Sequence, residues 1–207
     1  MNKNMSGLGY YLKYDEPDSK YGECVFLEYV YDECDNGYCS ETYIIRPSSI
    51  YYEDASFNGF TLEHLKTAKR VKRQKFNAVK DMMSSCRQEL DYLGMTGERV
   101  MSPEVKARDY YYSYSEDIEG GIVEDYFSYY YRIITVDDDL VTCQMHFLTK
   151  NNLVHETKIY TKRLEDFLDF EDTRWYKITE ELFYIAARKI DFITEEILNR
   201  FRKLYDN

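Results

Sequence analysis

The chain has 207 residues, of which 44% are hydrophobic and 31% are charged, and its 27 Lys and Arg against 38 Asp and Glu give a formal net charge of −11. This composition is globular rather than disordered or fibrous. No apolar run approaches the roughly 20 residues of a membrane span, and the first 20 residues have no apolar signal-peptide core, so we expect a protein that is cytoplasmic in the producing cell. The acidic balance argues against general nucleic-acid binding and against adhesion to anionic membranes.

The composition is unusual in having 23 tyrosines and only 3 prolines. An A+T-rich genome, such as that of a phage or another mobile element, favours tyrosine codons over proline codons. Tyrosine is also enriched where proteins meet, because its ring offers a large amphipathic area at low entropic cost. The two interpretations are compatible.

Residues 1–20 are polar and predict an N-terminal arm or a short edge element, and residues 21–207 predict a single α+β domain. Two segments rich in β-branched and aromatic residues predict a hairpin over 24–46. Asn36-Gly37 between them supplies both positive-φ positions of a type I′ turn. With those two residues as the loop, Cys34 faces Cys39.

A long helix is expected over 61–93, with Thr61 as its N-cap and Gly94 after its end. Apolar residues recur every three or four positions in its second half, which predicts a buried stripe there. In the first half the same stripe meets Lys69 and Lys72. We therefore expect that half to project from the core or to lie against a partner.

Strands are then predicted over 109–115, 122–136, 140–149 and 153–163, separated by turn formers. Short turns between successive strands favour an antiparallel meander over 109–163. A final helix is expected over 178–204. The predicted fold class is thus α+β, an antiparallel sheet (N-terminal hairpin plus four-strand meander) packed with two long α-helices.

The five cysteines and the pair His146 and His155 are the candidate metal or redox sites of the sequence. Cys34 and Cys39 face each other in the predicted hairpin, so a disulfide or half of a metal site is conceivable, but reduced thiols are expected in a cytoplasmic protein. With Asn151-Asn152 as a turn, His146 faces Thr157 and lies diagonally from His155 on the same sheet face. Two histidines without a third ligand indicate a surface pair. We expect no metal and no cofactor.

Asp137-Asp138-Asp139 followed by Glu156-Thr157-Lys158 has the order of acidic and Glu-x-Lys residues found in a group of metal-dependent nucleases. In the predicted register Asp139 lies about 26 Å along the strand from the position opposite Glu156, too far to share one Mg²⁺. A metal-dependent nuclease is therefore the remote alternative. We expect no catalytic residues and no enzyme.

Charge is strongly segregated along the chain. Residues 61–80 contain seven Lys and Arg against Glu63 alone, which leaves a net charge of −17 for the remainder. This predicts a partner-binding basic helix face made of Lys66, Lys69, Arg70, Lys72 and Arg73. The alternatives are a solvated face and local nucleic-acid contact, the latter opposed by the negative charge elsewhere.

We therefore expect a non-enzymatic structural or assembly protein of a phage or mobile element, incorporated into a virion or contacting copies of itself or neighbouring subunits in a head-to-tail oligomer or ring. The alternative is an acidic inhibitor that mimics nucleic acid and binds a basic host enzyme. Its candidate residues are Glu116, Asp117, Glu119, Glu124, Asp125, Asp137, Asp138 and Asp139.

Overall fold

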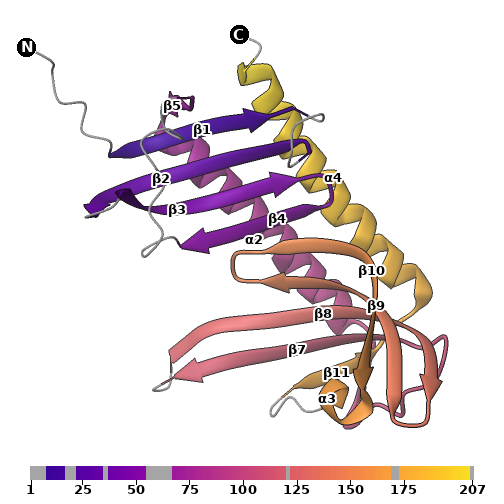
Figure 1. The fold of residues 1–207 in the computed structure, drawn as a ribbon. Coiled ribbons are helices and arrows are strands. Elements are labelled where there is room, and N and C mark those ends of the chain that lie inside the picture. The colour runs from indigo at the N-terminus through magenta and orange to yellow at the C-terminus, as the bar shows by residue number, and fades with distance from the viewer. Residues whose placement is uncertain are drawn as a thin grey trace, which may run out of the picture. The chain divides into compact units, whose positions relative to one another are not determined.

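The computed structural model describes residues 8–16, 22–34, 37–54, 67–119, 122–168 and 173–205, and these form antiparallel strands and helices, as the predicted α+β class requires (Figure 1). The chain groups into two compact units. The first consists of residues 1–82 and 194–207, and the second of residues 83–193. Each unit is described by itself below.

The first unit contains five antiparallel strands in the order β5-β1-β2-β3-β4. They are β1 (Gly9–Asp15), β2 (Cys24–Cys34), β3 (Gly37–Arg46), β4 (Ser49–Asp54) and β5 (Lys69–Val71). Strand β1 lies within residues 1–20, where an arm or a short edge element is expected. Its backbone is paired on both sides, by β2 and by β5.

The expected helix over 61–93 begins later in the structure. Residues 69–71 form strand β5, and helix α2 spans Arg73–Met95. The physical reason is long-range pairing, because Lys69 and Val71 lie opposite Leu12 and Tyr10 of β1. The predicted N-cap, Thr61, lies outside the described residues.

An aromatic cluster holds the start of α2 on the sheet of the first unit. The ring centroid of Phe76 lies 5.6 Å from that of Tyr10, 6.2 Å from that of Tyr29 and 5.1 Å from that of Tyr43. Such tilted and edge-on pairs contribute about 0.5–1.5 kcal/mol each beyond the area that they bury. The buried stripe of α2 therefore begins at Phe76.

The second unit contains six antiparallel strands in the order β10-β9-β8-β7-β11-β6. They are β6 (Glu98–Val100), β7 (Tyr110–Glu119), β8 (Ile122–Asp137), β9 (Leu140–Thr149), β10 (Leu153–Arg163) and β11 (Arg174–Lys177). A short helix, α3 (Leu164–Leu168), follows β10. The short strands β6 and β11 were not predicted from the sequence.

Tyrosines are buried on both faces of this second sheet. Tyr112 and Tyr130 lie side by side on the face that α2 covers, with ring centroids 5.0 Å apart. On the other face Tyr131 packs against Phe167 of α3 and against Trp175 of β11. Successive side chains of a strand point to opposite faces of the sheet, so neighbouring tyrosines enter two different core layers. These buried tyrosines serve packing rather than contact with partners.

The last helix, α4, spans Glu180–Tyr205, close to the expected 178–204. Thr179 caps it, since the Leu182 backbone N–H donates to Thr179 Oγ1 at 3.2 Å. Helices α2 and α4 each pass from one unit into the other along the chain. No helix in the described part of the chain is long and apolar enough to cross a membrane.

Candidate protein-binding surfaces

The basic residues predicted as one helix face are distributed over a strand and a helix. Lys69 and Arg70 lie on the edge strand β5, where Lys69 Nζ donates to the Leu204 carbonyl at 3.4 Å and Arg70 to the Leu8 carbonyl at 3.1 Å. Lys72 precedes α2 and Arg73 is its first residue, while Lys66 lies outside the described residues. The predicted single helical face is therefore corrected. We call Lys69, Arg70, Lys72, Arg73 and Lys75 the basic surface.

Three cations of the basic surface crowd the N-terminus of α2. Lys72, Arg73 and Lys75 are exposed, and no carboxylate among the described residues forms an ion pair with them. The first turn of α2 contains no acidic residue. A helix N-terminus carries partial positive charge. Each cation there therefore lowers the stability of the fold, by about 0.3–1 kcal/mol.

The predicted acidic residues form two separate groups at opposite ends of β8. Asp117 faces Asp125 where β7 ends and β8 begins, whereas Asp137 ends β8 and Asp138 and Asp139 form the β8–β9 turn. The step from Asp125 to Asp137 is twelve residues along the strand, which corresponds to roughly 40 Å. The β8 residues between these groups, 126–136, include no carboxylate. The side chains of Glu119 and Glu124 are outside the described part of the chain.

The group near the β7–β8 turn is partly used inside the protein. Glu116 accepts a hydrogen bond from the Tyr114 hydroxyl at 2.8 Å, and Asp125 Oδ1 accepts from the backbone N–H groups of Tyr126 and Lys150. Asp137, Asp138 and Asp139, by contrast, are all exposed. Asp138 has a positive φ of 50°, a conformation that Asp tolerates in tight turns.

The histidine pair lies in a different register from the predicted one. Thr149 organises the β9–β10 turn, since its Oγ1 accepts from the backbone N–H groups of Asn151 and Asn152 and its own N–H donates to the Asn152 carbonyl. The loop is therefore Lys150-Asn151 rather than Asn151-Asn152. This shift places His146 directly opposite His155 instead of Thr157, with ring centroids 4.7 Å apart.

His146 is also fully buried, which corrects the expectation of a surface pair. Its ring packs on Phe183 of α4 at 4.2 Å, and neither ring nitrogen has a hydrogen-bond partner among the described residues. Burial, together with the charge of nearby His155, lowers the pKa of His146 to about 3. His155 is half-exposed and its Nδ1 lies 2.7 Å from Asp191 Oδ1.

A buried polar network under α2 was not found from the sequence. Asp91 Oδ1 accepts from the Tyr112 hydroxyl at 2.9 Å and from the Ser128 hydroxyl at 2.7 Å, and Arg87 lies 4.0 Å from Oδ2. Burial raises the pKa of Asp91, while the two hydroxyl donors oppose that shift. The guanidinium of Arg87 also stacks over the Tyr126 ring at 3.8 Å. The network joins α2 to the sheet of the second unit.

The first hairpin also differs from its predicted register. Cys34 pairs with Gly37 and Asp32 with Cys39, so Cys34 does not face Cys39 as predicted, and residues 35–36 lie outside the described part of the chain. Cys39 is disulfide-bonded, which corrects the expectation of reduced thiols here; the side chain of Cys34 is outside the described part. Cys24, Cys86 and Cys143 are free and buried.

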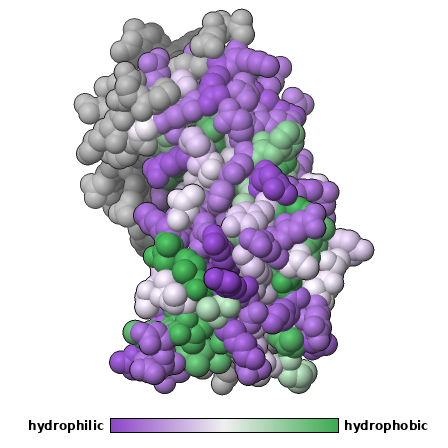
Figure 2. All heavy atoms as spheres, turned by 90° about the vertical axis from the view of Figure 1, so that its right-hand side faces the viewer, coloured by the Kyte–Doolittle hydropathy of each residue, from purple (hydrophilic) through white to green (hydrophobic). Residues whose placement is uncertain are grey.

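Exposed apolar side chains do not form one broad contact surface on the visible face. Figure 2 shows hydrophobic residues in small groups among hydrophilic ones. Tyr92, Met101, Ile159 and Phe192 are the most exposed of the large hydrophobic residues in the described part. Scattered apolar residues are ordinary on soluble domains. Charge is therefore the more informative property of the surface.

Within the described residues, no group of three or more His, Cys, Asp or Glu side chains is arranged to hold a metal ion. No protein-family model, no curated protein and no solved structure matches this chain.

Proposed function

We propose that the chain is a non-enzymatic protein that binds an acidic protein surface through the basic surface, as a component of an assembly. The observation that carries this proposal is the group of exposed cations at the N-terminus of α2, without a carboxylate partner among the described residues. These cations oppose the helix dipole, so they do not stabilise the fold. An acidic partner would convert an unfavourable feature of the free protein into a favourable contact.

A second copy of the chain is the partner that the charges favour. Outside residues 61–80 the chain has a net charge of −17, and Asp137, Asp138 and Asp139 are exposed. A basic surface on one copy and an acidic one on the next give a heterologous contact, which closes into a ring or continues as a filament. Such a contact suits a structural component of a phage or mobile-element assembly.

The geometry favours assembly over nucleic-acid mimicry. Double-stranded DNA carries about one charge for every 1.7 Å of its axis, so a mimic requires a repeated row of carboxylates. The acidic side chains on β8 are instead separated by a stretch, residues 126–136, that contains Arg132 and no carboxylate. One of the two groups is also partly engaged in internal hydrogen bonds.

The experiment reverses the charge of Lys72 and Arg73, which are both exposed and form no ion pair with a described residue. We expect Lys72→Glu/Arg73→Glu to keep or slightly raise the melting temperature, because carboxylates at a helix N-terminus are favourable. Sedimentation velocity over a range of concentrations and at two salt concentrations should show that association is strongly weakened. Like charges placed together at an interface oppose binding by several kcal/mol.

The matched control is Lys158→Glu/Arg188→Glu, which makes the same change in net charge on exposed residues of the second unit. It should associate like the wild type. Equal association of the Lys72→Glu/Arg73→Glu variant and the wild type would contradict the proposal. A wild-type protein that stays monomeric at high concentration would contradict self-association.

A further inference from the structure

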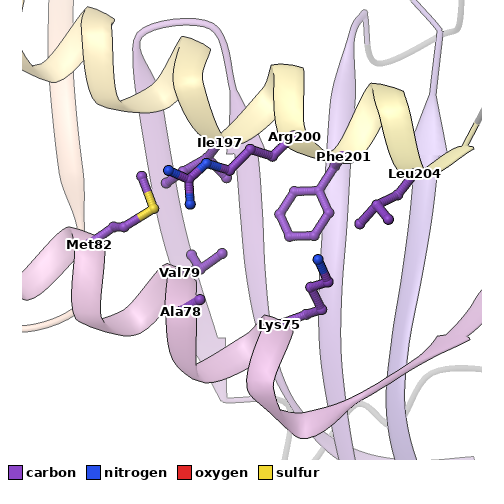
Figure 3. A pocket seen from close by; sticks show the side chains of 8 residues that line it. All are labelled: Lys75, Ala78, Val79, Met82, Ile197, Arg200, Phe201 and Leu204. Atoms are coloured by element: carbon purple, nitrogen blue, oxygen red, sulfur yellow. The ribbon is translucent and has the colours of Figure 1, made fainter.

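A small pocket lies between α2 and α4 in the first unit (Figure 3). Val79 of α2 and Ile197 and Phe201 of α4 form its apolar interior, and all three are buried. Figure 3 shows Phe201 and Leu204 pointing toward α2, and Val79 and Lys75 pointing toward α4. The pocket therefore has apolar walls supplied by both helices.

The pocket is suited to one aliphatic side chain. Its volume is about 70 Å³. An apolar cavity of about 150 Å³ accommodates a benzene molecule. The space between α2 and α4 has about half that volume, which suits a small apolar group such as the aliphatic side chain of leucine.

Two cations stand at the rim of this apolar space. Lys75 and Arg200 line the pocket, and both are exposed. Arg200 forms an ion pair with Glu196 on its own helix, whereas Lys75 has no ion pair with a described residue. Because a guanidinium group has five N–H donors, Arg200 can donate to a second carboxylate while it is paired with Glu196. The rim favours an occupant that carries carboxylates next to its apolar group.

The β8–β9 turn has that combination of side chains. Asp137, Asp138 and Asp139 are exposed, and Leu140, the next residue, is 42% exposed although it is a large apolar side chain. Asp137 and Leu140 pair directly across the two-residue turn. The paired strands β8 and β9 thus hold one exposed leucine beside three carboxylates at a two-residue turn.

We propose that the pocket between α2 and α4 receives Leu140 of a second copy, with Asp137–Asp139 of that copy facing Lys75 and Arg200. This inference rests on the proposed function and names the contact by which copies associate. The pocket belongs to the first unit and the turn to the second, so the two surfaces are different and each copy has both. The contact is therefore heterologous, and every bound copy leaves one pocket and one turn available for the next.

The test uses two substitutions that change no charge. Ala78 is an exposed residue that lines the pocket, and Ala78→Leu fills it with a good helix former. Leu140→Thr removes the aliphatic side chain but keeps a residue that suits a strand. The matched controls are Asn77→Leu, one residue from the pocket lining, and Ile159→Thr, an exposed apolar residue elsewhere in the second unit.

Dissociation constants come from sedimentation velocity of the full chain, after circular dichroism has shown that each variant is folded. Removing a central apolar contact of an interface commonly weakens binding about tenfold or more. We expect that loss for Ala78→Leu and for Leu140→Thr, and a change within about twofold for each control. A mixture of the two variants should form 1:1 dimers and stop there, because Ala78→Leu still has an intact turn and Leu140→Thr an intact pocket.

The outcomes separate this inference from the proposed function. If Ala78→Leu and Leu140→Thr associate like the wild type while Lys72→Glu/Arg73→Glu does not, the basic surface binds copies at another place and the pocket inference is wrong. If only the Leu140→Thr variant keeps wild-type association, the pocket receives a different segment of the second copy and Leu140 is excluded. If the wild type is monomeric at all concentrations, the pocket inference is wrong, and so is the choice of a second copy as the partner of the basic surface.

Discussion

His146 and His155 face each other directly across β9 and β10, with nearly perpendicular rings, and only His155 has a carboxylate partner, Asp191. The buried ring of His146 must therefore remain neutral in the folded protein. In the unfolded protein the same imidazole can be protonated, since an unperturbed histidine has a pKa of about 6.5.

This difference predicts a loss of stability in mild acid. Because the pKa of His146 is lowered to about 3 in the folded state, the unfolded state binds more protons between pH 6.5 and pH 3. Stability is retained above pH 6.5 and falls as the pH decreases, by about 2 kcal/mol at pH 5 for this one group. Urea unfolding at pH 7.5 and pH 5 measures it. His146→Phe should flatten the dependence, and His155→Asn should retain it; a slope unchanged in His146→Phe would refute the assignment.

The Asp91 network predicts a large effect from a single truncation. Asp91→Ala leaves the buried Tyr112 and Ser128 hydroxyls without their shared acceptor and Arg87 without its carboxylate, so we expect a loss of about 2–4 kcal/mol in the free energy of unfolding. Tyr112→Phe removes one donor and should lose only about 1 kcal/mol. Equal losses for both variants in urea titrations would show that the network does not act as described.

Gly94 predicts a steric effect that opposes helix propensity. A Cβ atom at this position would lie 2.3–2.6 Å from ring atoms of Tyr112, whose hydroxyl is bonded to Asp91. Alanine favours a helix over glycine by about 1 kcal/mol, but overpacking costs about 1–3 kcal/mol, so Gly94→Ala should be destabilising overall. In a Tyr112→Ala background the same change should be neutral or stabilising, and a double-mutant cycle measures the coupling.

The Glu23–Arg202 ion pair predicts that the C-terminal end of α4 is stabilised in a pH-dependent way. Arg202 contacts both carboxylate oxygens of Glu23, and the Tyr14 hydroxyl donates to one of them. Arg202 lowers the pKa of Glu23, so this stabilisation is present above pH 4.5 and is lost as the pH falls below it. Glu23→Gln should therefore speed amide hydrogen exchange over residues 195–205 at pH 7, whereas exchange in the second unit should not change. Equal exchange over 195–205 in both proteins would contradict this.

Local patterns predicted the long elements better than the short ones. The apolar spacing of α4 and the hydrophobic runs of β8 and β9 extend over many residues, and the structure places these elements near the expected positions. Strand β5 was missed because three residues carry no periodicity, and its conformation depends on β1, about 60 residues away in sequence. The strand registers of both hairpins differ from the predicted ones, and at β9–β10 the side-chain hydrogen bonds of Thr149 account for the difference.

For the candidate surfaces, too, the sequence predicted what depends on local composition and missed what depends on long-range packing. Charge counting identified the cations of the basic surface, because charge is visible in the sequence itself. It could not identify the pocket, since Val79 and Phe201 lie more than 100 residues apart and meet only through packing of α2 on α4. The Asp91 network was missed for the same reason: nothing local distinguishes Asp91 from the other acidic residues of the helix.

The tyrosines on both faces of the second sheet have a consequence for strand alignment. In most sheets a one-residue slip exposes apolar groups to water, and that penalty fixes the register. Here a slip of β7 would exchange Tyr111 with Tyr112, residues of equal shape and hydrophobicity. What distinguishes the two positions is their hydroxyl partners, the Asp109 carboxylate and Glu104 carbonyl for Tyr111 and the Asp91 carboxylate for Tyr112. The hydroxyl groups of these tyrosines thus determine the strand register. A sheet with phenylalanine in their place would fill the same volume but would have no single preferred register.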